Sequence, residues 1–290
     1  MRWEDGRRSE NVEDRRGLPV SRKVMVGGGG IGVLLIALLG LFFGFDPGVI
    51  FQGGSSIQAP SAPQTQSPGH QPPAAVDDKS KHFVSVVLAD TEDVWESVFS
   101  KAGRRYQPPK LVLFSQAAQS ACGFAQSAMG PFYCPLDNKV YLDTSFFQEM
   151  RSRFGAQGDF AQAYVIAHEV GHHVQTLLGI TQKVEERKRR AGPAEANNLS
   201  VRLELQADCL AGVWANQAHR TRQILEAGDI EEGLNAASAI GDDRIQKRTQ
   251  GYIVPDAFTH GSSAQRVRWF RRGLESGDLG QCNTFNTNRL

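Results

Sequence analysis

The segment His168-Glu169-Val170-Gly171-His172 combines residue types and a spacing that suit metal chemistry. Residues four apart lie on one face of a helix, about one turn apart, so both imidazoles can reach a single zinc ion. Glu169 would project beside them toward a water molecule, where a general base is needed. The spacing therefore predicts Zn²⁺ bound by His168 and His172, with Glu169 as the catalytic base. Three fixed residues also occur by chance, so the surrounding sequence has to support this interpretation.

The surrounding segment, Phe160 to Leu178, is apolar over most of its length, which predicts a buried helix. Asp159 with Gln162 is expected to cap its start, and Gly179 is expected to end it. A buried polar group without a partner costs about 1 to 3 kcal/mol, so two histidines and a glutamate in the middle of such a helix require one. A metal ion would be that partner.

A third protein ligand is needed, because a catalytic zinc ion uses three protein ligands and leaves its fourth position to water. Residues 201–217 are predicted to form a second helix that presents Glu204 and Asp208 one turn apart. Glu204 is the predicted third ligand, and Asp208 is predicted to accept the free ring N–H of a ligating histidine. The two roles could be exchanged, and a solvated helix face is the alternative. Small side chains are expected to let this helix approach the first one closely: Ala211, Gly212 and Ala215.

The rest of the pattern predicts an α+β, mostly helical domain. A helix is expected over residues 91–101, and the chain is expected to be mainly helical after residue 144. Strands are expected over residues 83–88, 110–114, 131–134 and 139–142, the last two as a hairpin. Residues 139–142 are also the predicted edge strand along which an extended peptide would lie.

Bulk composition is that of an ordinary globular protein. Of the 290 residues, 40% are hydrophobic and 22% are charged, and the formal net charge is +1. Because so small a charge gives nucleic acid no electrostatic reason to bind, no nucleic-acid partner is expected.

The N-terminal region contains a 22-residue stretch, 24–45, without a charged side chain. As a helix it could cross the roughly 30 Å hydrocarbon layer, and the arginines before it predict a cytoplasmic N-terminus. The prediction is a single-pass membrane protein with an uncleaved signal anchor and a zinc-binding domain outside the cytoplasm. Its expected parts are a cytoplasmic tail (1–23), a transmembrane helix (24–45), a flexible linker (46–81) and the zinc-binding domain (82–290). The membrane is an expected partner, bound through residues 24–45.

Further motifs accompany the histidines: Glu204-x-x-x-Asp208, Thr259-His260-Gly261-Ser262-Ser263, and Asn11-Val12-Glu13-Asp14-Arg15-Arg16-Gly17. In these motifs, and over nearly the whole chain, the sequence resembles the bacterial "putative neutral zinc metallopeptidases". The pair HExxH plus ExxxD is also similar to the Glu-zincin pattern. The resemblance implies a zincin-like domain, Glu204 as the zinc ligand, Asp208 as the partner of a ligand, and hydrolysis of a peptide or protein substrate. Together with the expected anchor, it implies a location in the bacterial inner membrane, with the domain in the periplasm or otherwise outside the cytoplasm. It does not define that substrate.

The oxyanion that forms during peptide hydrolysis is usually stabilised by one donor besides the metal. His260, Tyr252 and Arg266 are the candidates. His260 is preferred because it lies just ahead of a helix that is expected to begin at the capping pair Ser262 and Gln265. A structural histidine is the alternative reading of His260. His173 lies about 100° from the ligand face of its helix, so it is expected to pack in the core or to support a ligand, and not to bind the metal itself.

The four cysteines are expected to form disulfides if the domain lies outside the cytoplasm. Among the three possible pairings, Cys122 with Cys134 and Cys209 with Cys282 is preferred. Free buried thiols are the alternative. No two cysteines have the CxxC spacing of a structural zinc site.

Two other classes of protein remain open. One is a catalytically inactive, zinc-binding, membrane-anchored interaction or assembly protein, against which the intact Glu169 argues. The other is a purely structural membrane-anchored domain in which the HExxH pattern is fortuitous. Zinc content would separate the structural domain from the other two, and the activity of a Glu169→Gln variant would separate the enzyme from its inactive counterpart.

Overall fold

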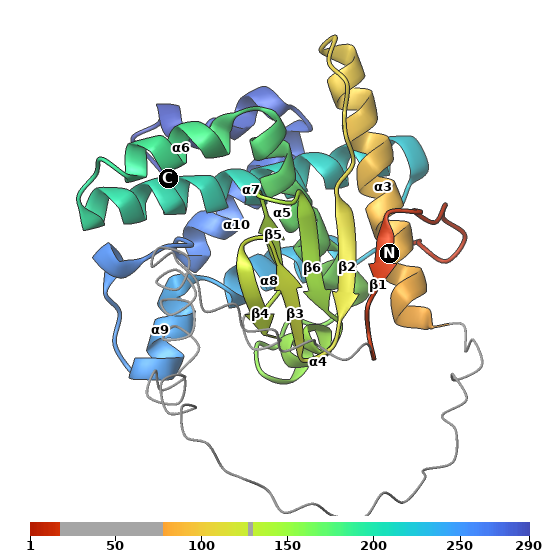
Figure 1. Cartoon of the computed structure of the whole chain (residues 1–290), viewed down its shortest axis with the longest axis horizontal. Coiled ribbons are helices and arrows are strands. Elements are labelled where there is room, and N and C mark those ends of the chain that lie inside the picture. Colours follow the sequence, from red (N-terminus) through yellow and green to blue (C-terminus); the bar gives the residue numbers. More distant parts are fainter. Residues whose placement is uncertain (18–77, 127–129) are drawn as a thin grey trace, which may run out of the picture.

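The structure is a computed structural model of the chain, and it describes residues 1–17, 78–126 and 130–290. The fold is α+β and mostly helical, as predicted, with a small sheet against a group of helices (Figure 1). The helices are α3 (Lys79–Lys101), α4 (Ser145–Ser152), α5 (Asp159–Leu177), α6 (Ile180–Lys188), α7 (Pro193–Arg222), α8 (Asp229–Ala239), α9 (Asp242–Gln250) and α10 (Ser263–Ser276), with 3-10 turns η2 (Pro255–Ala257), η3 (Leu279–Cys282) and η4 (Thr284–Asn286). The strands are β1 (Val12–Asp14), β2 (Lys110–Phe114), β3 (Ala117–Ser120), β4 (Gly123–Gln126), β5 (Phe132–Cys134) and β6 (Lys139–Asp143).

The larger sheet has the strand order β1-β2-β6-β5, and β3 and β4 form a separate two-stranded sheet. The predicted hairpin is present as the antiparallel pair of β5 and β6. The prediction that residues 139–142 form an edge strand is wrong, because β6 also pairs in parallel with β2. Turn residues reveal which two strands are joined, but the partner on the other side of β6 comes from a distant part of the chain. The edge of the sheet that contacts α5 is therefore β5.

The strand predicted over residues 83–88 is wrong, because these residues form the first half of α3. Asp78 caps this helix by accepting hydrogen bonds from the backbone N–H groups of Ser80 and Lys81. All of residues 83–92 are buried, so the sequence carries no polar stripe that would mark helical periodicity. Burial on nearly all sides thus outweighs the β propensity of the valines.

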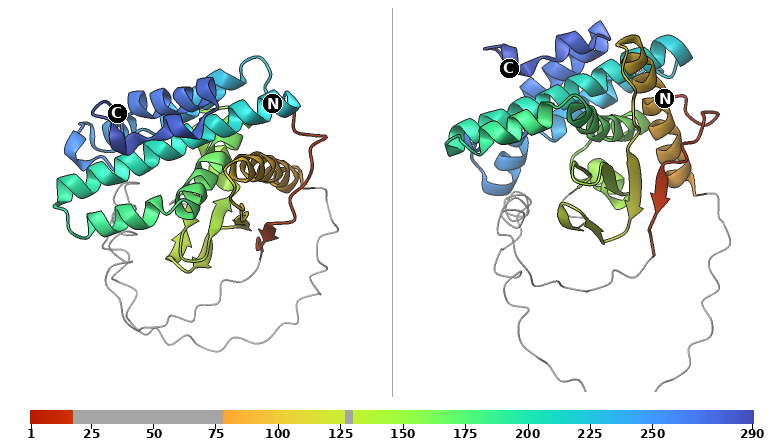
Figure 2. Two further views of the ribbon diagram at one scale, coloured as in Figure 1. Left: turned by 90° about the horizontal axis from the view of Figure 1, so that it is seen from above. Right: turned by 45° about the horizontal axis from the view of Figure 1, so that its top comes forward.

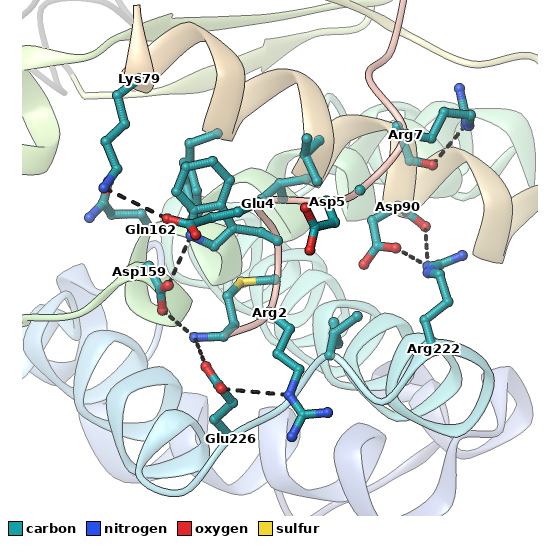
Figure 3. A pocket seen from close by; sticks show the side chains of 18 of the residues that line it. Arg2, Glu4, Asp5, Arg7, Lys79, Asp90, Asp159, Gln162, Arg222 and Glu226 are labelled. Carbon is teal, nitrogen blue, oxygen red and sulfur yellow. Dashed lines mark hydrogen bonds and ion pairs between the residues drawn. The ribbon is translucent and has the colours of Figure 1, made fainter.

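The N-terminal residues 1–17 pack against the helices and extend the sheet. Val12 of β1 lies opposite Leu111 of β2 in parallel register. The amino group of Met1 donates to Asp159 Oδ1 at 2.7 Å and to Asp229 Oδ1 at 3.2 Å, and thus places a positive charge in this acidic cluster. The first residues also line a cavity of about 870 Å³, in which Arg2 points toward Glu226 (Figure 3). The N-terminal segment therefore contributes directly to the position of α5, which begins at Asp159.

The predicted membrane helix over residues 24–45 lies outside the described residues. Within 1–17, 78–126 and 130–290, no helix combines the length and the apolar character needed to cross a bilayer. A single crossing over 24–45 would place β1 and β2 on opposite sides of a membrane, whereas they are paired neighbours in one sheet. The prediction of a single-pass inner-membrane protein with a cytoplasmic N-terminus and an external domain is therefore wrong.

Both predicted disulfides, Cys122–Cys134 and Cys209–Cys282, are present. The second joins α7 to η3 near the crossing of α7 and α10. Gly212 belongs to this crossing, because a Cβ at Gly212 would overlap the carbonyl group of Phe270 in α10. Gly212 was expected to allow close approach to the helix that carries the histidines, so that part of the prediction is wrong.

Candidate metal centre

Helix α5 carries the HExxH residues and is held at both ends by specific contacts. Its N-cap is Gly158, at φ 102°, and the Glu232 side chain accepts the Phe160 N–H at 3.1 Å. The predicted capping role of Asp159 is wrong, because the carboxylate of Asp159 binds the Met1 amino group and the indole N–H of Trp3 instead. The predicted stop is confirmed, since α5 ends at Leu177 and Gly179 adopts a left-handed conformation at φ 73°.

The three predicted ligand side chains meet between α5 and α7. His168 Nε2 lies 3.2 Å from Glu204 Oε2, and His172 Nε2 lies 3.4 Å from Glu204 Oε1. One ligand atom from each residue falls within 4.8 Å of the other two. Atoms bound at about 2.0 to 2.2 Å around a tetrahedral ion are separated by roughly 3.4 Å, so the spacing fits a small tetrahedral cation such as zinc.

A close crossing of α5 and α7 brings these ligands together. A Cβ at Gly171 would lie 3.1 Å from the carbonyl oxygen and 3.2 Å from the Cα of Ala207. Such contacts are tighter than side chains normally make, so glycine at this position lets the two backbones approach. The pattern's two intervening residues, Val170 and Gly171, thus include one that sets the helix spacing.

Each imidazole has an acceptor on Nδ1, which leaves Nε2 directed at Glu204. His168 Nδ1 donates to Asp208 Oδ1 at 2.8 Å. His172 Nδ1 donates to Gln175 Oε1 at 2.9 Å, and the Gln175 amide is itself fixed because its Nε2 donates to the Leu203 carbonyl at 2.7 Å. Partners of this kind fix both the tautomer and the ring orientation of metal-binding histidines.

Asp208 is fully buried and accepts hydrogen bonds from three side chains. Besides His168, these are the hydroxyl group of Tyr164 and the guanidinium of Arg266, whose Nε and Nη2 donate at 2.9 Å to the two carboxylate oxygens. Burial alone would raise the pKa of Asp208, but Arg266 and His168 outweigh it and lower the pKa to about 2. Asp208 therefore remains a carboxylate, and its charge is matched inside the protein.

The charges around the imidazoles favour a bound cation. Burial acts to lower the pKa of His168, but Asp208 and Glu204 outweigh it and raise the pKa to about 10. Burial acts to raise the pKa of Glu204, yet His172 and His260 hold it well below its ordinary value. A carboxylate against two ring nitrogens is a donor set that a divalent cation satisfies, since oxygen and imidazole ligands are both common for zinc.

Glu169 lies beside these ligands in a cavity of about 420 Å³ and is 9% exposed. Burial raises its pKa, against the opposing effect of His168 and His172. A carboxylate with a raised pKa is a stronger proton acceptor, which suits a general base near neutral pH. No residue described in the structure forms an ion pair with Glu169, so its carboxylate is not held by a cationic side chain.

His260 lines the same cavity, whereas the other two candidates for the oxyanion donor are placed differently. Its Nδ1 lies 3.2 Å from Oδ1 of the fully buried Asp242, whose other oxygen accepts the backbone N–H of His260 at 2.6 Å. Tyr252 is 63% exposed and does not line the cavity. Arg266 reaches the cavity, but its guanidinium is bound to Asp208 and to the Ile240 carbonyl.

Sequence reasoning missed Tyr164, Gln175 and Asp242. It also missed the role of Arg266 in binding a carboxylate. Gln175 lies three residues after His172 on the same helix, a spacing that could have signalled it. Asp242 and Arg266 reach the centre from α9 and α10, and no local pattern connects either of them to α5. His173 is a packing residue as predicted, buried with Nε2 donating to the Gln107 carbonyl at 2.6 Å.

The comparisons with known proteins identify the family of the chain. Residues 1–285 match the family described as "Putative neutral zinc metallopeptidase", and the chain belongs to that family. It is 50% identical over 293 residues to "Uncharacterized protein YpfJ" of Escherichia coli K12, covering 98% of this chain and 99% of that protein. It is 42% identical over 217 residues to "Uncharacterized protein Rv2575" of Mycobacterium tuberculosis H37Rv, covering 71% of this chain and 72% of that one. No solved structure matches the chain.

Proposed function

We propose that this protein is a zinc-dependent peptidase of the Glu-zincin type, with His168, His172 and Glu204 as the metal ligands. The observation that carries the proposal is the meeting of these ligand atoms within 4.8 Å in a cavity that also contains Glu169. A site that only stored or displayed a metal would have no need of a buried carboxylate beside it. The domain is zincin-like on this proposal, with α5 and α7 as the two ligand helices.

Zinc bound there would polarise the scissile carbonyl and make water acidic enough to lose a proton near neutral pH. Glu169 accepts the proton from the attacking water and passes it to the leaving amine. Burial assists the first step, because it raises the proton affinity of the Glu169 carboxylate. The peptide itself would lie along β5, which is an edge strand of the larger sheet within the described residues and contributes Phe132 and Tyr133 to the cavity.

His260 is the proposed donor to the oxyanion. Its Nδ1 lies 3.0 Å from Thr259 Oγ1 and 3.2 Å from Asp242 Oδ1, and the ring lines the cavity, so Nε2 is the nitrogen proposed to face the substrate. Burial acts to lower the pKa of His260, but Glu204 and Asp242 outweigh it and raise the pKa. This favours the imidazolium, in which Nε2 carries a proton that it can donate.

Zinc-dependent cleavage is the direct test of the proposed function. The full chain, treated with a chelator and dialysed, is expected to lose cleavage of a mixture of unstructured peptides and to regain it when zinc is added back. Cleavage products are identified by mass spectrometry, and bound zinc is measured by atomic absorption. A chain that binds zinc stoichiometrically but cleaves no peptide would instead be an inactive zinc-binding protein.

Weakening the support of His260 should lower the rate without removing the metal. In Asp242→Asn the His260 ring loses a charged acceptor worth about 1.5 to 3 kcal/mol, so kcat is expected to fall about 10- to 100-fold. Zinc content and KM are expected to change little, because Asp242 contacts no metal ligand. Loss of zinc in this variant would show that Asp242 supports the fold of the centre rather than the donor.

A further inference from the structure

The cavity at the metal centre is apolar at one end. This end is lined by side chains from α4 and its C-terminal flank, from the first half of α5, and from the region of α8 and α9: Phe146, Phe154, Val165, Ile240 and Ile245. The rings of Phe146 and Phe154 are adjacent, with centroids 6.5 Å apart. Gly130 completes the wall, since a Cβ there would already touch the Phe146 ring at 3.4 Å. None of these side chains can donate or accept a conventional hydrogen bond, although the Phe154 ring has the guanidinium groups of Arg153 and Arg248 over it, at 6.0 and 5.3 Å from its centroid.

The opposite end of the cavity is polar. It is formed by α6 and the first turns of α7, which run side by side (Figure 2), and α6 lies above α4 and α9 in the view of Figure 1. Glu185 and Lys188 line it and form an ion pair at 3.0 Å, Thr181 and Ser200 add hydroxyl groups, and Leu203 is an apolar side chain among them. The ligands and Glu169 lie between the two ends, because Val165 precedes Glu169 by one turn of α5 and Thr181 follows the end of that helix.

This asymmetry has a physical consequence for any peptide whose scissile bond lies at the ligands. A large apolar side chain at the apolar end would displace water from Phe146, Val165 and Ile245, which is favourable. An acidic side chain would lose hydration there, and the apolar side chains of this end would not replace its hydrogen bonds, which is costly. At the polar end, donors and acceptors are available to a polar side chain or to the peptide backbone.

We infer that the substrate carries a large aliphatic or aromatic residue on one side of the scissile bond, selected by Phe146, Val165 and Ile245. This inference rests on the proposed function, since it assigns the position of the scissile bond. It adds a substrate class, peptides with an apolar residue next to the cut, that the ligand set alone does not define.

Binding of short peptide hydroxamates tests the selection without turnover. Compounds that differ only in the side chain next to the hydroxamate, namely leucine, alanine and aspartate, are titrated calorimetrically into the zinc-loaded full chain. The leucine compound is expected to bind about tenfold or more tightly than either of the others, the usual scale of discrimination in an apolar pocket. Equal affinities for the three compounds would overturn the inference.

A matched pair of variants tests the assignment to Ile245. Ile245→Ser is expected to reduce the preference for leucine about tenfold, because it places a hydroxyl group in the apolar end. Ile253→Ser is the control, since Ile253 is 45% exposed and does not line the cavity. Ile245→Phe keeps the end apolar but fills it, so it should weaken binding of the leucine compound and leave binding of the alanine compound unchanged. This variant tests the assignment even if the serine variant folds poorly. An unchanged preference in both Ile245 variants contradicts it.

A peptide-library digest by the full chain separates this inference from the proposed function. Cleavage without an apolar preference on either side of the cut would overturn the inference and support the function. Selective binding of the leucine hydroxamate by a chain that cleaves no peptide would support the inference about the apolar end and overturn the proposed function.

Discussion

Glu169→Gln should lower kcat/KM for peptide cleavage by about 10²- to 10⁴-fold, the range that a positioned general base contributes. Glutamine has nearly the shape of glutamate but cannot accept the proton of the attacking water. Glu169 does not belong to the group of metal ligands, so zinc content should not change. The expected pattern is thus a lost rate with a retained metal.

The measurement combines single-turnover cleavage with zinc analysis on the same samples. Glu186→Gln is the matched control, because this substitution removes the same charge from α6. The Glu186 side chain is 55% exposed and does not line the cavity. Cleavage by Glu169→Gln at the rate of the unmodified chain would exclude Glu169 as the base. Loss of zinc in that variant would indicate instead that Glu169 helps to hold the ligands.

The parts of this structure that sequence reasoning could predict are those whose cause lies within a few residues. The HExxH spacing identifies one face of α5, and the spacing from Glu204 to Asp208 identifies one face of α7. Ser262 with Gln265 forms the predicted capping box at the start of α10. In each case the interacting groups are close along the chain, so the pattern contains both partners.

The parts that could not be predicted depend on contacts between distant segments. The order of the sheet needs β1 from residues 12–14 beside β2 from residues 110–114, and no local pattern encodes that pairing. The local sequence predicts that Asp159 caps a helix, but its carboxylate accepts hydrogen bonds from Met1 and Trp3, which are distant in the sequence. The same holds for the centre itself, where Arg266 was considered only as a donor to the oxyanion. Its actual partner, Asp208, is 58 residues away.

The ion pair between Arg266 and Asp208 predicts that Asp208→Asn lowers both the stability of the protein and its affinity for zinc. The side chain keeps its shape, so no cavity forms, but the fully buried Arg266 guanidinium loses its only carboxylate partner within the described residues. Removing one member of a buried ion pair typically costs about 3 to 5 kcal/mol, because the remaining charge stays in the interior uncompensated. His168 Nδ1 also loses a charged acceptor, so zinc affinity should fall about 10- to 100-fold.

Unfolding of the metal-free chain in denaturant measures the loss of stability. A competition titration with a zinc-binding dye measures the loss of zinc affinity. Asp256→Asn, at an exposed position in η2, is the control and should leave both quantities unchanged. Arg266→Met provides the complementary test, since it leaves the charge of Asp208 unmatched while His168 keeps its acceptor. If Asp208→Asn were as stable as the unmodified chain, the Arg266 charge must find compensation elsewhere, and Asp208 would not be the residue that holds α7 and α10 at the metal centre.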